Sequence, residues 1–282
     1  MSPYLPSSPH RLITFVTHPQ LADCIEKSAA VFRSARRVVA LTGAGVSTRS
    51  GIPDFRSRDS GLWKKYDPMT VASLASFRYH PKDFFKWVRP LVKTMIDAEP
   101  NPAHTAFAKL EQAGFLHGII TQNIDDLHRK AGSKRIYEIH GHLREATCTS
   151  CYQKRNAKSL IEAFARTGAL PYCDLCGSLL KPDIILFGEQ LPTIIVSEAQ
   201  ALIDDADLIV VAGSSMEVMP AASMPIPALN AGAKLIIINN EPTYLDIRAD
   251  FVIRDDVADV LPMILQEVLR EPKETKRLVS NQ

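Results

Sequence analysis

The fold of this chain follows from the stretch Val38-Val39-Ala40-Leu41-Thr42-Gly43-Ala44-Gly45-Val46-Ser47. Its first four residues are all apolar, which is typical of a strand that is buried on both faces within a parallel sheet. Two glycines follow at once, in the strand–turn order that lets backbone N–H groups approach a pyrophosphate. The dinucleotide fingerprint G-x-G-x-x-G fails at its third position, where Thr48 stands. On its own, this stretch leaves a nucleotide site and an ordinary tight turn both open.

Further short apolar runs alternate with helical stretches along the rest of the chain. The runs cover residues 118–121, 184–187, 208–211, 235–238 and 251–253. Helices are expected over residues 21–32, from the Asn101-Pro102 cap to Gly114, and from about Asp259 to Leu269 with Pro262 in the first turn. This alternation predicts an α/β fold with a Rossmann-like parallel sheet.

Two stretches interrupt the alternation, and we expect them to form a smaller inserted lobe. The Rossmann-like domain would comprise residues 20–56, 101–144 and 183–270. A helical module with a cofactor loop would occupy residues 57–100, and a zinc-ribbon module residues 145–182. Residues 271–282 are mostly polar, which favours a flexible tail.

The composition narrows the class of protein. The 282 residues carry 33 Lys and Arg against 31 Asp and Glu, a formal net charge of +2. A protein that binds nucleic acid mainly by neutralising phosphates needs a clear basic excess, so direct nucleic-acid binding is not expected. No apolar run approaches the ~18 residues of a membrane span, and the N-terminus lacks a secretory signal. We therefore expect a soluble, cytoplasmic, monomeric protein that does not bind membranes.

Four of the five cysteines form two C-x-x-C pairs separated by 21 residues, namely Cys148, Cys151, Cys173 and Cys176. Four thiolates with this spacing can surround Zn²⁺ at about 2.3 Å, and a fully protein-filled shell makes the metal structural. Redox-active or simply buried cysteines are the alternative. Three cations near the pairs could offset the charge of a zinc tetrathiolate, namely Lys154, Arg155 and Lys181. Cys24 is expected to pack as a small hydrophobe.

Polar or small residues follow several of the expected strands. They form the segments Thr121-Gln122-Asn123-Ile124-Asp125, Gly213-Ser214-Ser215 and Asn239-Asn240-Glu241, and the loop Ser50-Gly51-Ile52-Pro53-Asp54-Phe55-Arg56 extends the first turn. Ligands of open parallel sheets bind beyond the carboxyl ends of the strands, so these segments predict a binding crevice with several donors and acceptors.

In this order, the motifs resemble the sirtuin family of NAD-dependent protein deacylases. The resemblance rests on Gly43–Ser47 with Gly51–Arg56, Thr121–Asp125, Ile139-His140-Gly141, the two cysteine pairs, Phe187-Gly188-Glu189 and Gly213-Ser214-Ser215. It runs from about residue 30 to residue 268. It implies that NAD is consumed, that nicotinamide is released, and that the acyl group of an acyl-lysine passes to ADP-ribose.

The resemblance also implies which residues bind NAD. The phosphate and ribose side would be formed by Gly43, Ala44, Gly45, Ser47, Thr48, Asp54, Phe55 and Arg56, with Phe55 keeping water from the reactive ribose carbon. Gln122, Asn123, Ile124 and Asp125 would surround nicotinamide and its ribose. The adenosine half would contact Gly213, Ser214, Ser215, Asn239 and Val257.

His140 is the expected general base, and Asn123 is the second catalytic candidate. In the family, a histidine accepts a ribose hydroxyl proton, and His140 would also contact NAD. Imidazole suits this task because its pKa of ~6.5 leaves it mostly neutral yet basic near pH 7. His104 and His128 lie in expected helices and favour packing or capping roles.

An acetylated-lysine protein substrate would bind between the lobes by strand addition, next to Phe187, Gly188, Glu189 and Val218. Phe55, Phe187 and Val218 would line an apolar acyl tunnel. Family members that prefer succinyl or malonyl groups carry a Tyr-x-x-Arg pair, and residues 84–91 contain none, since Arg89 lacks the tyrosine. This favours a deacetylase. The alternatives are a deacylase for longer chains, a mono-ADP-ribosyltransferase, a nicotinamide dehydrogenase and a non-catalytic zinc-scaffolded binding module.

Overall fold

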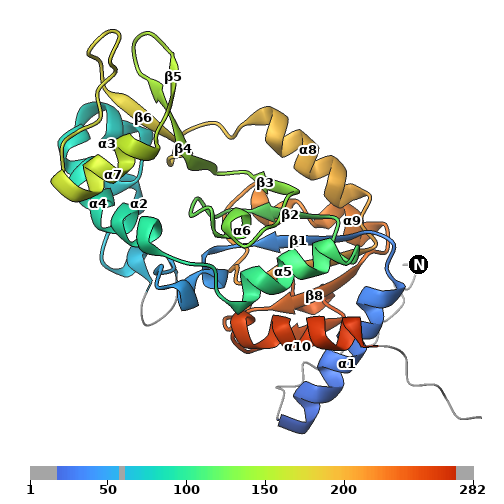
Figure 1. The fold of residues 1–282 in the computed structure, drawn as a ribbon. Helices are drawn as coiled ribbons and strands as arrows, with labels where there is room; N and C mark the ends of the chain where they lie inside the picture. The colour runs from blue at the N-terminus through green and yellow to red at the C-terminus, as the bar shows by residue number, and fades with distance from the viewer. Residues whose placement is uncertain (1–17, 57–60, 271–282) are drawn as a thin grey trace, which may run out of the picture.

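The computed structural model describes residues 18–56 and 61–270, which form a larger and a smaller lobe (Figure 1). The larger lobe is built on a six-stranded parallel sheet with the strand order β3-β2-β1-β7-β8-β9. The strands are β1 (Val38–Thr42), β2 (Gly118–Thr121), β3 (Ile136–Glu138), β7 (Leu208–Ala212), β8 (Lys234–Ile238) and β9 (Phe251–Ile253). The predicted Rossmann-like α/β fold is confirmed.

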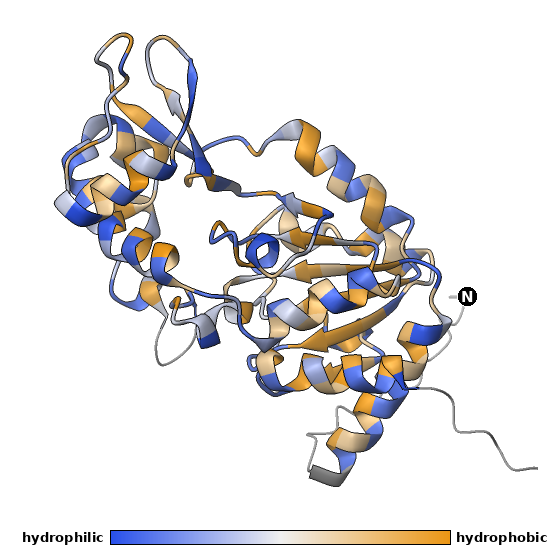
Figure 2. Cartoon of the chain, in the orientation of Figure 1, coloured by the Kyte–Doolittle hydropathy of each residue, from blue (hydrophilic) through white to orange (hydrophobic). Residues whose placement is uncertain are grey.

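Helices cover both faces of this sheet. One face carries α1 (His18–Ser34), α5 (Pro102–Gln112) and α10 (Val257–Leu269), and the other carries α8 (Thr193–Asp204) and α9 (Ile226–Asn230). Within β1, Val38 and Ala40 belong to the core on the α1 side, whereas Val39 and Leu41 belong to the core on the α8 side. Each strand therefore needs apolar residues at every position, which explains the orange strands between the helices in Figure 2.

The N-terminal cap of α5 is the predicted one, whereas that of α10 differs from the prediction. The Asn101 side chain accepts a hydrogen bond from the Ala103 N–H (2.9 Å) and caps α5 as expected. Helix α10 begins at Val257, two residues before the predicted start, because the Asp256 side chain caps it through the Ala258 N–H (2.8 Å). Pro262 consequently lies inside α10 and not in its first turn.

The smaller lobe combines an antiparallel sheet with four helices. The sheet has the order β5-β4-β6, with β4 (Gly141–Cys148), β5 (Lys154–Asn156) and β6 (Leu180–Ile184). The helices are α2 (Pro68–Val71), α3 (Leu74–Tyr79), α4 (Pro81–Asp97) and α7 (Lys158–Thr167). The short α6 (Leu127–Lys130) follows β2, and 3-10 turns occupy η1 (Ala44–Val46), η2 (Thr48–Ser50), η3 (Leu62–Lys64), η4 (Ala221–Ser223) and η5 (Asp246–Arg248).

One strand prediction is wrong, and one strand was missed. Residues 184–187 do not form a buried parallel strand, because the chain there leaves β6, which pairs antiparallel with β4 in the smaller sheet. The sixth strand of the parallel sheet is instead β3, an edge strand of only three half-buried residues. Such a strand carries no continuous apolar run, so the sequence pattern does not reveal it.

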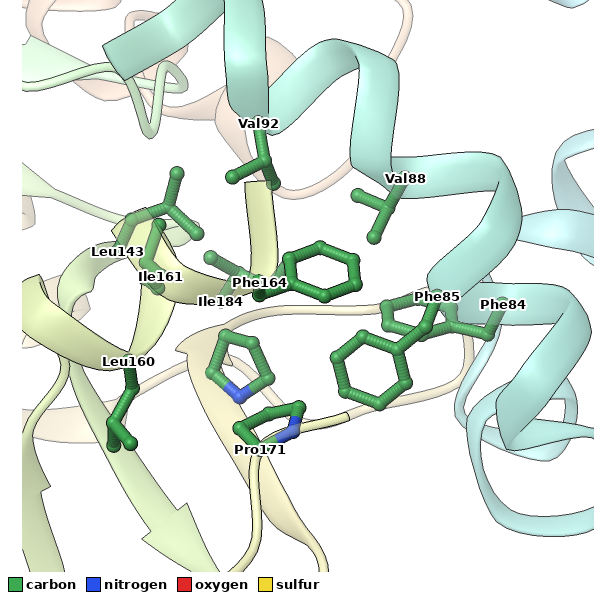
Figure 3. A pocket seen from close by; sticks show the side chains of 11 residues that line it. Phe84, Phe85, Val88, Val92, Leu143, Leu160, Ile161, Phe164, Pro171 and Ile184 are labelled. Carbon is green, nitrogen blue, oxygen red and sulfur yellow. The ribbon is translucent and has the colours of Figure 1, made fainter. Parts of the chain in front are cut away.

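The helices and the sheet of the smaller lobe share a core. Phe84, Phe85 and Val88 of α4 meet Phe164 of α7 and Ile184 of β6 (Figure 3). These side chains enclose an apolar cavity of about 20 Å³, too small for a substrate. The module boundaries given above stay a prediction, and the predicted tail at 271–282 lies outside the described residues. In the described part of the chain, no helix is both long and apolar enough to cross a bilayer.

Candidate active site

The polar segments predicted from the sequence meet at the carboxyl edge of the parallel sheet. Thr42, the last residue of β1, pairs in register with Thr121 of β2 and with Ala212 of β7. Ala212 in turn pairs with Ile238, the last residue of β8. Because these four strands end at the same level, the segments that follow them start side by side.

The glycine turn after β1 packs against the loop after β7. The Gly45 N–H donates to the Gly213 carbonyl (2.8 Å). A Cβ on Gly45 would lie 2.8 Å from the Gly213 Cα, and a Cβ on Gly213 would lie 2.3 Å from the Val46 nitrogen. Gly213 also has a φ of +57°, in the left-handed region. These glycines therefore let the two loops pack directly against each other, a requirement for glycine that the sequence alone did not indicate. The close approach of this backbone to a pyrophosphate stays a prediction.

Ser47, Asn123 and Asp125 form a buried hydrogen-bonded cluster in the crevice. The Asn123 Nδ2 donates to the Gly43 carbonyl (3.0 Å) and to the Ser47 Oγ (3.2 Å). The Ser47 hydroxyl donates to Asp125 Oδ2 (2.6 Å), and burial raises the pKa of this carboxyl. Three predicted NAD-binding side chains thus hold one another in fixed positions.

His104 extends this cluster into the core and was not predicted as part of the site. Its Nδ1 accepts from the Asn101 N–H (3.3 Å), so its Nε2 carries the proton and faces the Ser47 Oγ (3.4 Å). Burial lowers the pKa of His104 to about 4, which keeps the ring neutral. The predicted capping role of His104 is confirmed by its bond to Asn101, but the contact with Ser47 arises from the tertiary structure alone.

His140 lies just before β4 with one ring nitrogen facing the backbone. Its Nδ1 is 3.0 Å from the Gln122 carbonyl, which can only accept, so Nδ1 carries the proton and Nε2 is a free proton acceptor. Burial, and secondly the Arg56 cation, lower the pKa of His140. A neutral imidazole with an available lone pair can act as a general base at neutral pH. The following Gly141, at φ +76°, packs against the Asp183 carbonyl, where a Cβ would clash.

The loop that carries Asp54, Phe55 and Arg56 reaches across to the smaller lobe. The Asp54 side chain accepts from the Arg56 N–H (3.1 Å), and the Arg56 guanidinium pairs with Glu217 (2.9 Å). The Phe55 ring stacks on Trp63 with 4.9 Å between centroids, and Trp63 lies 5.9 Å from the Phe187 ring in a T-shaped contact. Trp63 was missed because a single tryptophan in a loop carries no sequence signal of its own.

A pocket beside the glycine turn gathers residues predicted for the adenosine half and residues predicted for the phosphate and ribose side. The adenosine set contributes Gly213, Asn239 and Val257, and the phosphate and ribose set contributes Gly45, Thr48 and Asp54. Asn240 and Glu241 of the predicted polar segment also line the pocket, together with Asp255 and Asp256, which were not predicted. The Asn239 Nδ2 donates to the Glu241 carbonyl (2.7 Å). Acidic residues of this kind can accept hydrogen bonds from ribose hydroxyls.

The remaining predicted NAD-binding residues lie near these groups. The buried Ser214 accepts a hydrogen bond from the Gln122 Nε2 (2.9 Å), and the half-buried Ser215 follows it. The Ala44 carbonyl accepts from the Ser47 N–H (3.0 Å) and closes the η1 turn. Ile124 is half-buried against the cores of the smaller lobe.

The predicted peptide-binding residues 187–189 lie in the chain that leads from β6 of the smaller lobe to α8 of the larger lobe. The Phe187 backbone pairs with the chain around Ser73, through the Leu74 N–H to its carbonyl (2.9 Å) and from its own N–H to Ala72 (3.0 Å). Glu189 turns back to accept from the Leu186 N–H (3.0 Å). A strand added here would use Gly188, which is exposed, and the segment that contains the half-buried Val218.

The four paired cysteines converge as the sequence predicted. Their sulfurs all lie within 4.8 Å of one another, with 3.4 Å between Cys148 and Cys176 and 3.8 Å between Cys151 and Cys173. Zn–S bonds of about 2.3 Å in a tetrahedron place sulfurs about 3.8 Å apart, so the cluster fits Zn²⁺.

The flanking cations pair with nearby carboxylates, and Arg155 also interacts electrostatically with Cys173 and Cys151 of the cluster. Lys154 pairs with Glu145 and Asp183 (both 3.2 Å), Arg155 with Asp174 (2.8 Å) and Lys181 with Glu189 (3.0 Å). Each of these cations has a carboxylate partner, because the surrounding strands and turns supply acidic side chains that the cysteine spacing does not reveal.

These features define an α/β protein with a Rossmann-like sheet, a polar crevice at its carboxyl edge and an inserted four-cysteine lobe. Residues 43–220 match the model of the Sir2 family, and the chain belongs to this family. The predicted resemblance is confirmed.

The chain is similar to proteins of this family over nearly their whole length. It is 43% identical to NAD-dependent protein deacylase 2 of Archaeoglobus fulgidus, covering 89% of this chain and 98% of that protein. It is 40% identical to NAD-dependent protein deacetylase of Sulfolobus acidocaldarius, covering 88% and 96%. A structure solved for the mechanism and regulation of Sir2 enzymes has a TM-score of 0.82 at 43% identity, covering 87% and 98%. A Sir2–p53 peptide–NAD⁺ structure has a TM-score of 0.79 at 37% identity, covering 86% and 98%.

Proposed function

We propose that this chain is an NAD-dependent protein-lysine deacetylase, which transfers the acetyl group of acetyl-lysine to ADP-ribose and releases nicotinamide. The observation that carries the proposal is the buried Ser47–Asn123–Asp125 cluster beside a neutral His140 with a free Nε2. Relatives at 40–43% identity are named NAD-dependent protein deacylases and deacetylases. Solved Sir2 structures contain NAD⁺ with a p53 peptide, or 3'-O-acetyl ADP-ribose with a deacetylated p53 peptide.

The residues present fit NAD, which supplies the ADP-ribose acceptor and the nicotinamide leaving group. The pocket lined by Gly213, Asn239 and Val257 would hold the adenosine half, while Asp125 would read the nicotinamide carboxamide. His140 Nε2 would accept the ribose hydroxyl proton, and its burial favours the neutral form that this step needs. The Phe55–Trp63 stack would keep water from the reacting centre.

The four cysteines would hold one Zn²⁺ with a structural role. A shell that is filled by four protein thiolates leaves no position for a catalytic water. The cluster ties the turn after β4 to the turn before β6, and so it would hold the outer end of the smaller lobe together.

The surroundings of Arg89 support a neutral acyl group. Its Nε donates to the Ala165 carbonyl (3.1 Å) and its guanidinium also donates to the Arg166 carbonyl (2.8 Å) at the end of α7. These two bonds use two of the five N–H groups of Arg89 and hold the guanidinium at the end of α7. Longer neutral chains stay an alternative, because a Sir2 protein with a propionylated peptide is among the similar structures, at a TM-score of 0.77.

One experiment tests the reaction. The pure protein is incubated with NAD and acetyl-lysine, butyryl-lysine or succinyl-lysine forms of one peptide, and all products are followed by mass spectrometry. We expect deacetylated peptide, nicotinamide and acetylated ADP-ribose in equal amounts, no succinyl transfer, and loss of all products in His140→Ala but not in His142→Ala. Nicotinamide release with ADP-ribose on a protein side chain and an intact acetyl group would instead support mono-ADP-ribosyl transfer.

A cytoplasmic location and a monomeric state belong to the same proposal. The formal net charge of +2 is close to neutral, which supports a protein that functions without binding a large charged partner. Light scattering coupled to gel filtration tests the monomer directly, and a dimer would contradict it.

A further inference from the structure

An ion pair joins two loops of the candidate site. The Arg56 Nε lies 2.9 Å from Glu217 Oε2, and so the loop after β1 is joined to the loop after β7. The Arg56 side chain is 31% exposed and the Glu217 side chain is 64% exposed. Met216, at φ +54° and with a buried side chain, anchors the chain just before Glu217 and turns the carboxylate outward. The pair is therefore a contact between the loops that follow β1 and β7, two strands that end at the same edge of the sheet.

Arg56 lies at the reacting end of the site. Its cation is close enough to lower the pKa of His140, whose ring contacts the Gln122 carbonyl. Two other arginines near the adenosine pocket are held by groups of the larger lobe, Arg49 by Asp256 (2.6 Å) and Arg254 by the Asn239 carbonyl (2.9 Å). The partner of Arg56 is a mostly exposed carboxylate on a different loop, which water can replace at low cost.

We propose that Glu217 is the exchangeable counter-ion of Arg56 and, once released, a specificity-determining residue for the acyl-lysine peptide. This inference rests on the proposed function. Both phosphates of a pyrophosphate are negatively charged, and guanidinium groups bind phosphate oxygens in a bidentate manner. When Arg56 turns to the pyrophosphate, the Glu217 carboxylate loses its partner at the segment that would lie along the peptide. A basic side chain next to the acyl-lysine is the group that restores its pairing.

The two exchanges are coupled by linkage. A ligand that binds Arg56 frees Glu217 to pair with another group. A basic side chain of the peptide that pairs with Glu217 likewise frees Arg56. The free energy of this coupling is the same in both directions, so either ligand strengthens the binding of the other. Since exposed ion pairs are weak, each effect should be roughly two- to fivefold in affinity.

The first test measures binding without peptide. NAD and ADP-ribose are titrated by calorimetry into the full chain as wild type, Glu217→Gln, Glu217→Asp and Glu198→Gln. Glu198 is an exposed residue of α8, so Glu198→Gln makes the same charge change on another surface. We expect Glu217→Gln to bind both ligands roughly two- to fivefold more tightly and to lose affinity more steeply with salt. Glu217→Asp and Glu198→Gln should match the wild type.

The second test measures the peptide. Acetyl-lysine peptides carry either arginine or its neutral isostere citrulline at one position within two residues of the acetyl-lysine, and binding is measured with and without ADP-ribose. For at least one position, ADP-ribose should strengthen wild-type binding of the arginine peptide more than that of the citrulline peptide. Glu217→Gln should abolish this difference.

The outcomes separate this inference from the proposed function. A wild type that binds neither NAD nor ADP-ribose would overturn both. A wild type that binds them, with Glu217→Gln of equal or weaker affinity, would overturn the counter-ion exchange and leave the deacetylase proposal standing. Loss of the arginine preference at every position would overturn the role in peptide selection.

Discussion

Replacing Gly213 by alanine tests whether the glycine turn of this protein is needed for contact between two loops. A Cβ at this position would lie 2.3 Å from the Val46 nitrogen and 2.5 Å from the Gly45 carbonyl carbon. Non-bonded heavy atoms are most stable about 3.5 to 4.0 Å apart, so the two loops must separate by roughly 1 Å. Gly213 also has a φ of +57°, which an alanine adopts only at a cost.

The expected loss of stability has two parts that a control variant separates. The left-handed backbone costs an alanine about 1–2 kcal/mol. Moving packed backbone adds about 1–3 kcal/mol. Gly114 has a φ of +81°, and a Cβ on it would meet no other atom within 4 Å, so Gly114→Ala should show the first cost alone. Gly213→Ala should therefore be the more destabilised variant.

Urea unfolding of both variants, followed by titration with NAD, checks this reasoning. Because Gly45 and Ser47 belong to the displaced turn, we expect Gly213→Ala to weaken NAD binding by up to about 100-fold, the scale of a 1 Å misplacement in a site. Gly114→Ala should bind NAD like the wild type. If the two variants lose the same stability and both keep NAD affinity, the contact between the loops is not what requires glycine.

Four further predictions concern titration, metal and strain. Burial lowers the pKa of His140 below 6.5, so the rate of deacetylation should stay level to below pH 6.5 before it falls; a fall centred above pH 6.5 would contradict this. Burial lowers the pKa of His104 to about 4, so below pH 6.5 the unfolded chain binds more protons and stability should drop by up to about 3 kcal/mol as pH approaches 4. His104→Gln should reduce that dependence in urea unfolding, and the buried His128, whose pKa burial also lowers, should keep part of it. Elemental analysis should show less zinc in Cys173→Ser than in the wild type, and this variant should melt at a lower temperature. Cys24→Ser should keep the zinc content and the melting temperature of the wild type. Tyr152 follows a cysteine pair, is 76% exposed and has a φ of +59°. Replacing it by glycine should raise the free energy of unfolding by about 0.5–1 kcal/mol, and no increase would refute backbone strain there.

The order of the motifs along the chain was enough to predict the family, the parallel sheet and the metal-binding cysteines. Each of these depends on local pattern: continuous apolar runs make strands that are buried on both faces, and two C-x-x-C pairs make two turns that aim sulfurs at one point. The Asn101 cap is equally local, since its partner is the Ala103 N–H two residues away.

The sequence did not reveal which strands pair or which side chains meet across loops. Residues 184–187 have the composition of a buried strand, yet β6 joins β4, while the three residues of β3 complete the parallel sheet. The reason is that strand pairing is a contact between distant segments, whose outcome depends on the whole set of competing partners.

Most strands, the α5 cap, the cysteine cluster and the residue types of the site could be predicted from the sequence, because they follow from neighbours in the chain. The folded chain was needed to show that His104 reaches Ser47, that His140 presents Nε2, and that Arg56 meets Glu217. These contacts join residues 57, 18 and 161 positions apart, respectively. Their geometry and the pKa values that depend on burial arise only when the sheet brings its strand ends to one edge.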